Sequence, residues 1–151
     1  MIKCNYMNKY DFFIAARYRN KDNALRLANL IREKGYQPYC FVESNASTSH
    51  VGSLDCNGEE AMTAFEAIKD WQNDPRVKDI FKTDMDALRV SETHILLLPA
   101  GKSAHMETGV SYGLGKKMIC IGEQKETESL YIMFDEFHDT IEEFIDGLDQ
   151  K

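Results

Sequence analysis

The most informative stretch of the chain is residues 96–122, LLLPAGKSAHMETGVSYGLGKKMICIG. Its pattern predicts an apolar strand, a Gly-Lys-Ser loop, a glycine-rich helix and a second apolar strand. A strand that leads through a polar loop into a helix is typical of a ligand site, because the first amides of the helix have no partners within it. Ser103 is the expected N-cap of this helix, and Glu107 is then a carboxylate in its first turn.

The spacing of residues within this helix limits the kinds of ligand site that it can form. Gly109 and Gly113 lie four residues apart on one face, which predicts that the helix packs closely on a sheet and holds Glu107 in place. A capping box needs Glu or Gln at position 106, where the chain has Met106, so reciprocal capping does not explain Glu107. The loop lacks the earlier glycine of a P-loop, and the glycines do not form G-x-G-x-x-G. Walker-type phosphoryl transfer and the usual dinucleotide fingerprint are therefore excluded.

On either side of this stretch, apolar strands alternate with amphipathic helices. Strands are expected at residues 10–16, 36–42, 93–98 and 117–121, and helices at about 22–34, 59–71, 84–90, 104–114 and 139–148. Pro38 favours an edge position for the second strand, because proline has no N–H to give to a neighbour. This alternation predicts an α/β fold, a three-layer α/β/α sandwich with a mostly parallel, flavodoxin- or Rossmann-like sheet.

The middle of the chain carries less information. Residues 43–58 are rich in Ser, Asn, Gly and Thr and have no helical or strand period, so they predict a long loop of the kind that often forms a lid. Met62, Phe65 and Trp71 follow helical spacing and are expected in the core. A further segment starts at Asp74-Pro75, before the short helix at 84–90, and residues 129–134 form a short element of undetermined type.

Length and charge limit the class of protein. A chain of 151 residues is the size of one domain, which we take as residues 1–151. The net charge is −7, and residues 123–151 hold ten acidic residues against two lysines, which leaves residues 1–122 near +1. This balance argues against a nucleic-acid partner, and the acidic tail is expected to be a solvated helix face.

The cysteines and the hydropathy bear on location. None of the four cysteines has C-x-x-C spacing, and Cys40 and Cys120 lie in apolar runs, which predicts buried, reduced thiols. The chain has no run of about 18 apolar residues and no signal peptide, so we expect no membrane association and a cytoplasmic protein. His50, His94 and His138 lack zinc-ligand spacing, and we expect no metal ion and no cofactor.

Polar residues gather at one predicted edge of the sheet. The loops after Ala16 and after the 93–98 strand both follow carboxyl ends of strands, so residues 17–19 and 101–107 are expected to face one another. Arg17, Arg19, Lys102 and Ser103 could then hold a phosphate, or the cations could be scattered and solvated. His105 could bind phosphate, shuttle a proton or simply be exposed.

These segments resemble the nucleoside 2-deoxyribosyltransferases and their relatives, which include the 2′-deoxynucleoside 5′-monophosphate N-glycosidases. The resemblance rests on Asp84, on the strand at 93–98, on the Glu-x-Gly-x-Ser-x-Gly-x-Gly-Lys segment from Glu107 to Lys116, and on the strand at 117–121. The opening strand followed by Tyr18 is also similar to the start of these proteins. The matched residues are roughly 10–36 and 81–122.

The resemblance implies chemistry at the anomeric carbon of a nucleoside or nucleotide, the expected small-molecule partner. Glu107 would be the nucleophile, Asp84 would handle the departing base, and Tyr18 would position Glu107 or the sugar. Water as acceptor gives a hydrolase, and a second base gives a transferase. The residues expected to bind substrate are Ala16, Arg17, Arg19, Gly101, Lys102, Ser103 and His105.

The resemblance also implies a homodimer. Two alternatives stay open at this point. A TIR-like NAD glycohydrolase would share a flavodoxin-like arrangement and a glutamate that acts on an N-ribosidic bond. A catalytically inactive nucleotide-binding sensor is favoured by Ser103 and His105, which add bulk beside the expected sugar site where the family has smaller residues.

Overall fold

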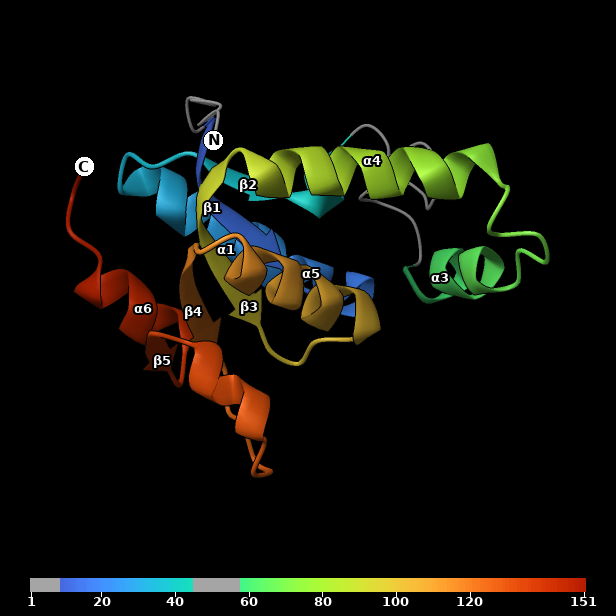
Figure 1. Ribbon diagram of the computed structural model, residues 1–151. Helices are drawn as coiled ribbons and strands as arrows, with labels where there is room; N and C mark the ends of the chain where they lie inside the picture. Colours follow the sequence, from blue (N-terminus) through green and yellow to red (C-terminus); the bar gives the residue numbers. More distant parts are fainter. Residues whose placement is uncertain (1–8, 45–57) are drawn as a thin grey trace, which may run out of the picture.

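Five parallel strands form the central sheet of the computed structural model, which describes residues 9–44 and 58–151 (Figure 1). Their order is β2-β1-β3-β4-β5, the flavodoxin-like order, so the predicted parallel sheet is confirmed. Pro38 lies in an edge strand, as predicted. The strands are β1 (Tyr10–Ala15), β2 (Pro38–Cys40), β3 (Ser91–Leu97), β4 (Lys117–Ile121) and β5 (Glu136–His138), the last of which the sequence does not predict.

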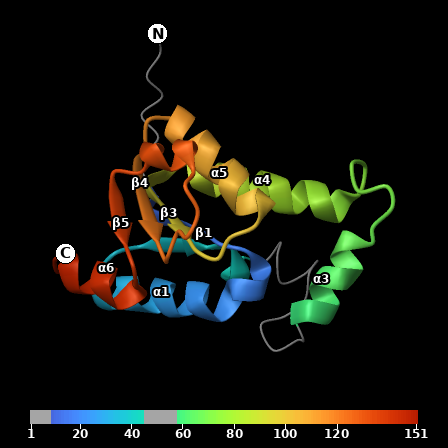
Figure 2. The same ribbon diagram turned by 90° about the horizontal axis from the view of Figure 1, so that it is seen from below.

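Helices cover both faces of this sheet, which confirms the three-layer sandwich. Figure 2 shows α1 (Lys21–Glu33) and α6 (Ile141–Gly147) on one face, and α4 (Pro75–Arg89) and α5 (Lys102–Gly113) on the other. A further helix, α3 (Gly58–Glu66), lies outside the three layers at the end of the molecule. Short 3-10 turns complete the fold: η1 (Tyr18–Asn20), η2 (Phe41–Glu43) and η3 (Ser129–Met133).

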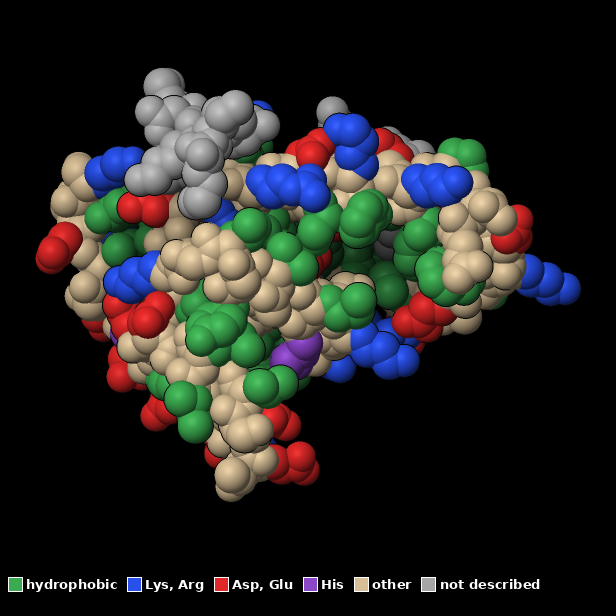
Figure 3. Space-filling model, in the orientation of Figure 1, with side chains coloured by type: hydrophobic (Ala, Val, Ile, Leu, Met, Phe, Trp, Pro, Cys, Tyr) green, Lys and Arg blue, Asp and Glu red, His purple; other side chains and the backbone are tan. Residues whose placement is uncertain are grey.

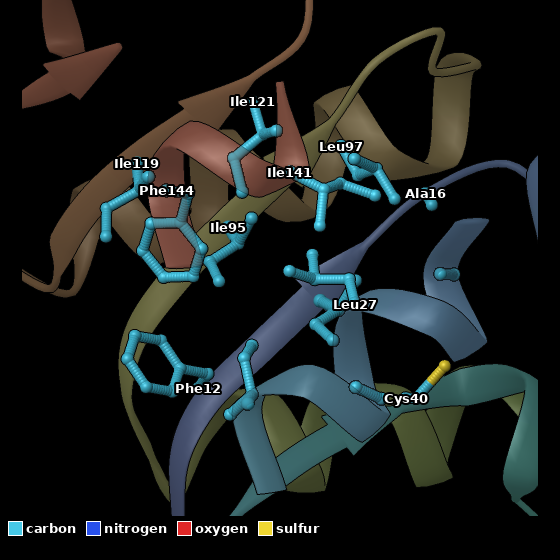
Figure 4. Close-up of a cluster of buried hydrophobic side chains, with 14 of the residues drawn as sticks. Phe12, Ala16, Leu27, Cys40, Ile95, Leu97, Ile119, Ile121, Ile141 and Phe144 are labelled. Atoms are coloured by element: carbon cyan, nitrogen blue, oxygen red, sulfur yellow. The ribbon is translucent and has the colours of Figure 1, made fainter. Parts of the chain in front are cut away.

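The core is divided in two by the sheet. Alternate residues of β1 point to opposite sides, so that Phe12 and Ile14 join the cluster under α1 and α6, while Phe13 joins the cluster under α4 and α5. Figure 4 shows the first cluster, in which Leu27 of α1 and Phe144 of α6 meet the strands. Burial on both faces explains the nearly continuous apolar sequence of β1.

The region between β2 and β3 differs from its prediction in two ways. Trp71 is 56% exposed and Met62 and Phe65 are only partly buried, so the prediction that they belong to the core is wrong. Four other helices already cover the two faces of the sheet, and α3 reaches the core cluster only through the partly buried Ala61 and Met62. The segment from Pro75 and the helix expected at 84–90 are one 15-residue helix, α4, which Asp74 caps by accepting from the Arg76 amide.

Helix α5 begins earlier than predicted. Its N-cap is Gly101, so Ser103 lies inside the first turn and Glu107 in the second, and the predicted cap is wrong. The predicted packing of Gly109 and Gly113 is also wrong, because both are exposed and a Cβ on either would meet no atom within 4 Å. The small residues that do pack on the sheet are Ala104, Thr108 and Ser111, at helical spacing on another face.

The remaining predictions concern the cysteines, the last helix, the 43–58 loop and membrane association. Cys40 and Cys120 are buried free thiols, and the apolar face of α6 is buried through Ile141, Phe144 and Ile145, as expected. Most of the predicted 43–58 loop lies outside the described residues, as do Cys4, Cys56 and His50. None of the helices described here is long and apolar enough to cross a membrane.

Candidate active site

A cavity of about 540 Å³ opens at the carboxyl ends of β1 and β3, beside η2. The strand order reverses between these two neighbouring strands, since the chain runs outward from β1 to β2 and then crosses back to β3. Parallel α/β sheets bind their ligands at such a switch point. Figure 3 shows the hollow between α4, α5 and α3, with hydrophobic side chains toward α4 and cationic side chains below.

Two predicted loops meet here as the sequence indicates. Ala16, Arg17, Tyr18 and Arg19 follow β1, and Gly101, Lys102 and Ser103 start α5, and all of them line the cavity. A Cβ on Gly101 would lie 3.6 Å from the Arg17 Cβ, so the two loops approach one another closely. Asp84 from α4 and Glu107 from α5 line the same space. The structure thus gathers nine predicted site residues from three chain segments.

Asp84 is held by a tyrosine from the neighbouring strand. The Tyr39 hydroxyl of β2 donates to Asp84 Oδ1 at 2.7 Å. Burial raises the pKa of Asp84 to about 6, against the opposing effect of this hydrogen bond, which favours the carboxylate. Tyr39 remains a neutral donor, since burial and the charge of Asp84 raise its pKa.

Glu107 shares the cavity with this carboxylate. Burial, and then the negative charge of Asp84, raise the pKa of Glu107 to about 8. Two acids that repel one another in this way titrate as a pair. Between about pH 6 and pH 8 the pair therefore holds one proton.

Arg19 reaches the cavity but its guanidinium is already paired. Nε and Nη2 donate to the two carboxylate oxygens of Glu59 at 2.7 and 2.9 Å, and Nη1 donates to Glu66 at 3.2 Å. This arrangement differs from the predicted role of Arg19 as a substrate ligand. The sequence could have indicated it, because Glu59 and Glu66 stand seven residues apart on one helical face.

His105 faces a different cavity. Its Nδ1–H donates to the Gly101 carbonyl at 2.8 Å, so its Nε2 accepts from the Tyr131 hydroxyl, also at 2.8 Å. The ring stacks on Tyr131 and lines a separate cavity of about 660 Å³ between α5 and residues 123–134. The structure therefore does not bring His105 to the carboxylates, because residues two apart on a helix do not face the same side.

Sequence reasoning considered His94 only as a metal ligand, yet it anchors α5. Thr108 donates its hydroxyl proton to the Ala104 carbonyl at 2.8 Å, so the His94 Nε2–H donates to Thr108 at 2.9 Å. Ser111 then donates to Nδ1 at 2.8 Å. Burial lowers the pKa of His94 to about 3, which keeps the ring neutral. This pairing fixes α5 on β3 and with it the position of Glu107.

Several cavity residues are not predicted as site residues. Phe41 of η2, Met62 and Phe65 of α3, and Ile80 of α4 form apolar lining. Their spacing fits a core helix equally well, so the sequence alone does not distinguish a cavity wall from a core. Among residues 9–44 and 58–151, no group of three or more His, Cys, Asp or Glu side chains could hold a metal ion.

The chain is thus an α/β protein with a two-carboxylate cavity at the switch point of a flavodoxin-like sheet. Neither a family model nor a curated protein sequence matches it. Its structure is similar to that of the 2-deoxyribosyltransferase from the psychrotolerant bacterium Bacillus psychrosaccharolyticus, with a TM-score of 0.59 and 13% identity over 91% of each chain. The fold is therefore nucleoside 2-deoxyribosyltransferase-like, as the resemblance of residues 10–36 and 81–122 implies.

Proposed function

We propose that the protein cleaves or transfers at the N-glycosidic bond of a deoxynucleoside or nucleotide, with Glu107 as nucleophile. One observation carries the proposal: Glu107 and Asp84 line a single cavity at the sheet edge where this fold binds ligands. The 2-deoxyribosyltransferase of similar structure supports a nucleoside as the class of substrate.

The reaction follows from the two carboxylates. As the bond from C1′ to the base nitrogen breaks, positive charge develops at C1′, and a Glu107 carboxylate oxygen forms a bond to that carbon. Protonated Asp84 gives its proton to the departing base. A water then attacks C1′ and gives a proton to Asp84, the bond from C1′ to Glu107 breaks, and the free sugar leaves. Alternatively, the N–H nitrogen of a second base attacks C1′ and gives its proton to Asp84, the bond to Glu107 breaks, and a new nucleoside forms.

The scheme needs one proton on the two carboxyls together. Burial raises both pKa values, so the pair keeps a proton near neutral pH. The reactive form carries this proton on Asp84, and the form with the proton on Glu107 has the same total charge. At neutral pH the pair therefore reaches its active form when its proton moves between the two carboxyls, and no proton is taken up or released.

The two ends of the cavity differ in chemistry. Arg17 and Lys102 lie beside the first amides of α5, where a 5′-phosphate would find cationic and N–H donors. The opposite side is apolar and suits a nucleobase. Tyr18 belongs to the loop after β1 and is a buried residue of the cavity lining, and we infer that it orients the sugar or Glu107.

A homodimer is part of the same proposal. Met106, Val110 and Leu114 expose hydrophobic surface along α5, and this surface would be covered by a second copy. Light scattering would then give a mass near twice 17.3 kDa, whereas a monomeric mass would contradict the dimer. The cytoplasmic location stays a prediction.

The test is a panel of deoxynucleosides, their 5′-monophosphates and NAD, with released base measured by chromatography. Wild type should release base from at least one deoxynucleoside or nucleotide, and Glu107→Gln should lose at least about 10³-fold in rate. Glu92→Gln and Asp86→Asn remove exposed carboxylates elsewhere and should have little effect. Release by Glu107→Gln at the wild-type rate would contradict the proposed role of Glu107.

Other outcomes of the panel point to other functions. Release of nicotinamide from NAD alone would favour the NAD glycohydrolase. Tight nucleotide binding without turnover, measured by calorimetry, would favour the sensor. Either result would overturn the proposed reaction.

A further inference from the structure

Helix α3 forms one wall of the cavity without being part of the core. Within the described structure, none of its side chains is buried, yet Met62, Phe65 and Glu66 line the cavity. Its contacts with the rest of the fold are peripheral: Met62 packs on the edge of the core cluster, and a Cβ on Gly58 would lie 3.3 Å from the Tyr18 ring. Hydrophobic burial alone therefore contributes little to its position.

Arg19 connects this wall to the loop after β1. Its guanidinium binds Glu59 through two nitrogens and Glu66 through the third, as described above. Glu59 lies in the first turn of α3 and Glu66 is its last residue, so one guanidinium holds both ends of the helix. A planar guanidinium suits this geometry, whereas a lysine ammonium would not hold two carboxylates in fixed directions.

The wall that Arg19 holds is the apolar one. Met62 and Phe65 face the cavity together with Phe41 and Ile80, while Arg17 and Lys102 line it from the loops after β1 and β3. A nucleobase has two apolar faces and stacks on aromatic side chains, so it fits the first surface and not the second.

We propose that Arg19 is a positioning residue that holds α3 against the cavity, and that Met62 and Phe65 on this wall contact the nucleobase of the substrate. The base contact rests on the function proposed above. The position of α3 does not rest on that function, because it follows from the ion pairs of Arg19 with Glu59 and Glu66.

Hydrogen exchange tests the first part without any substrate. In Arg19→Gln the amides of residues 62–66 should exchange at least about fivefold faster than in wild type, while those of α1 are unchanged. Arg26→Gln is the matched control, since it removes an exposed Arg–Glu pair between α1 and α6, with Glu142, away from the cavity. Salt at 0.5 M should reproduce the effect in wild type, because exposed pairs are screened. Unchanged exchange in Arg19→Gln would overturn this part.

Kinetics test the second part. Phe65→Ala should raise KM about tenfold and leave kcat within about twofold, because a base contact made equally in the ground and transition states affects binding alone. Arg19→Gln should raise KM in the same direction, with Arg19→Lys intermediate. Phe81→Ala removes an exposed phenylalanine of α4 outside the cavity lining and is the control.

The outcomes separate the two proposals. Faster exchange with an unchanged KM would overturn the base contact and leave the positioning role standing. A wild-type protein that releases no base would overturn the proposed function and the base contact together, while the exchange experiment would still decide the role of Arg19.

Discussion

Glu107 and Asp84 bring two acids into one partly closed space, and their coupled titration sets a pH dependence. The singly protonated pair is the active form, so kcat/KM should follow a bell with limits near pH 6 and pH 8. Asp84→Asn removes the proton donor and also the charge that raises the pKa of Glu107. The residual activity of the variant should therefore have no alkaline limit and should rise with pH through a single Glu107 pKa below 8. A pH-rate profile of both proteins checks this, and a bell with an alkaline limit near pH 8 in the variant would contradict the assigned roles.

Burial of the Glu107 carboxyl also lowers the stability of the protein at alkaline pH. The pKa of Glu107 rises from its usual 4.5 to about 8 on folding, so its contribution to stability is complete below pH 4.5 and is lost as the pH rises through 8. Glu107→Gln should match wild type near pH 4 and be more stable at pH 8.5 by at least about 1 kcal/mol, or roughly 2–4 °C in Tm. Thermal unfolding at both pH values measures this. A difference that does not change with pH would contradict the buried carboxyl.

Individual residues were predictable where a local motif identifies them. Glu107 and Asp84 lie in segments with a recognisable pattern, and the topology brings them to one cavity. The contacts of Arg19 and His105 were not, because their partners Glu59 and Tyr131 lie 40 and 26 residues away in the sequence. Helical spacing puts Glu59 and Glu66 on one face and turns His105 away from Glu107, but it does not give the distant side chain that each one meets.

At the scale of the element, His94 explains why α5 packs as it does. Its two ring nitrogens bind Thr108 and Ser111, residues on the face that packs on β3. Serine and threonine at these positions replace the glycine contacts that the 109–113 spacing suggests. The helical period predicts which residues share a face of the helix. Which of these faces is buried depends on the side chains of the neighbouring strand.

His94 should stay neutral, with its proton on Nε2, at pH values well below the usual pKa of histidine. Burial lowers its pKa to about 3, so the ring should not titrate between pH 8 and pH 4. Nitrogen-15 NMR of the imidazole distinguishes the two tautomers and follows the titration. Protonation near pH 6.5, or a proton on Nδ1, would contradict the hydrogen-bond assignment.

Across the whole molecule, the alternation of strands and helices was enough to predict the parallel sheet and its three layers. The place of the site also followed, because the carboxyl edge of such a sheet is common to the class. The position of α3 did not, since its composition resembles that of a core helix and both sheet faces are covered by other helices. Exposed ion pairs to Arg19 place α3 instead, and their partners are distant in sequence.

The central claim is that Glu107 forms a covalent bond to the sugar. Wild type mixed with a substrate identified in the panel should be quenched within one turnover, digested and examined by mass spectrometry. We expect a glycosyl group on the peptide that contains Glu107, and no such group in Glu107→Gln. Released base with no adduct on Glu107, or an adduct on another residue, would contradict the account.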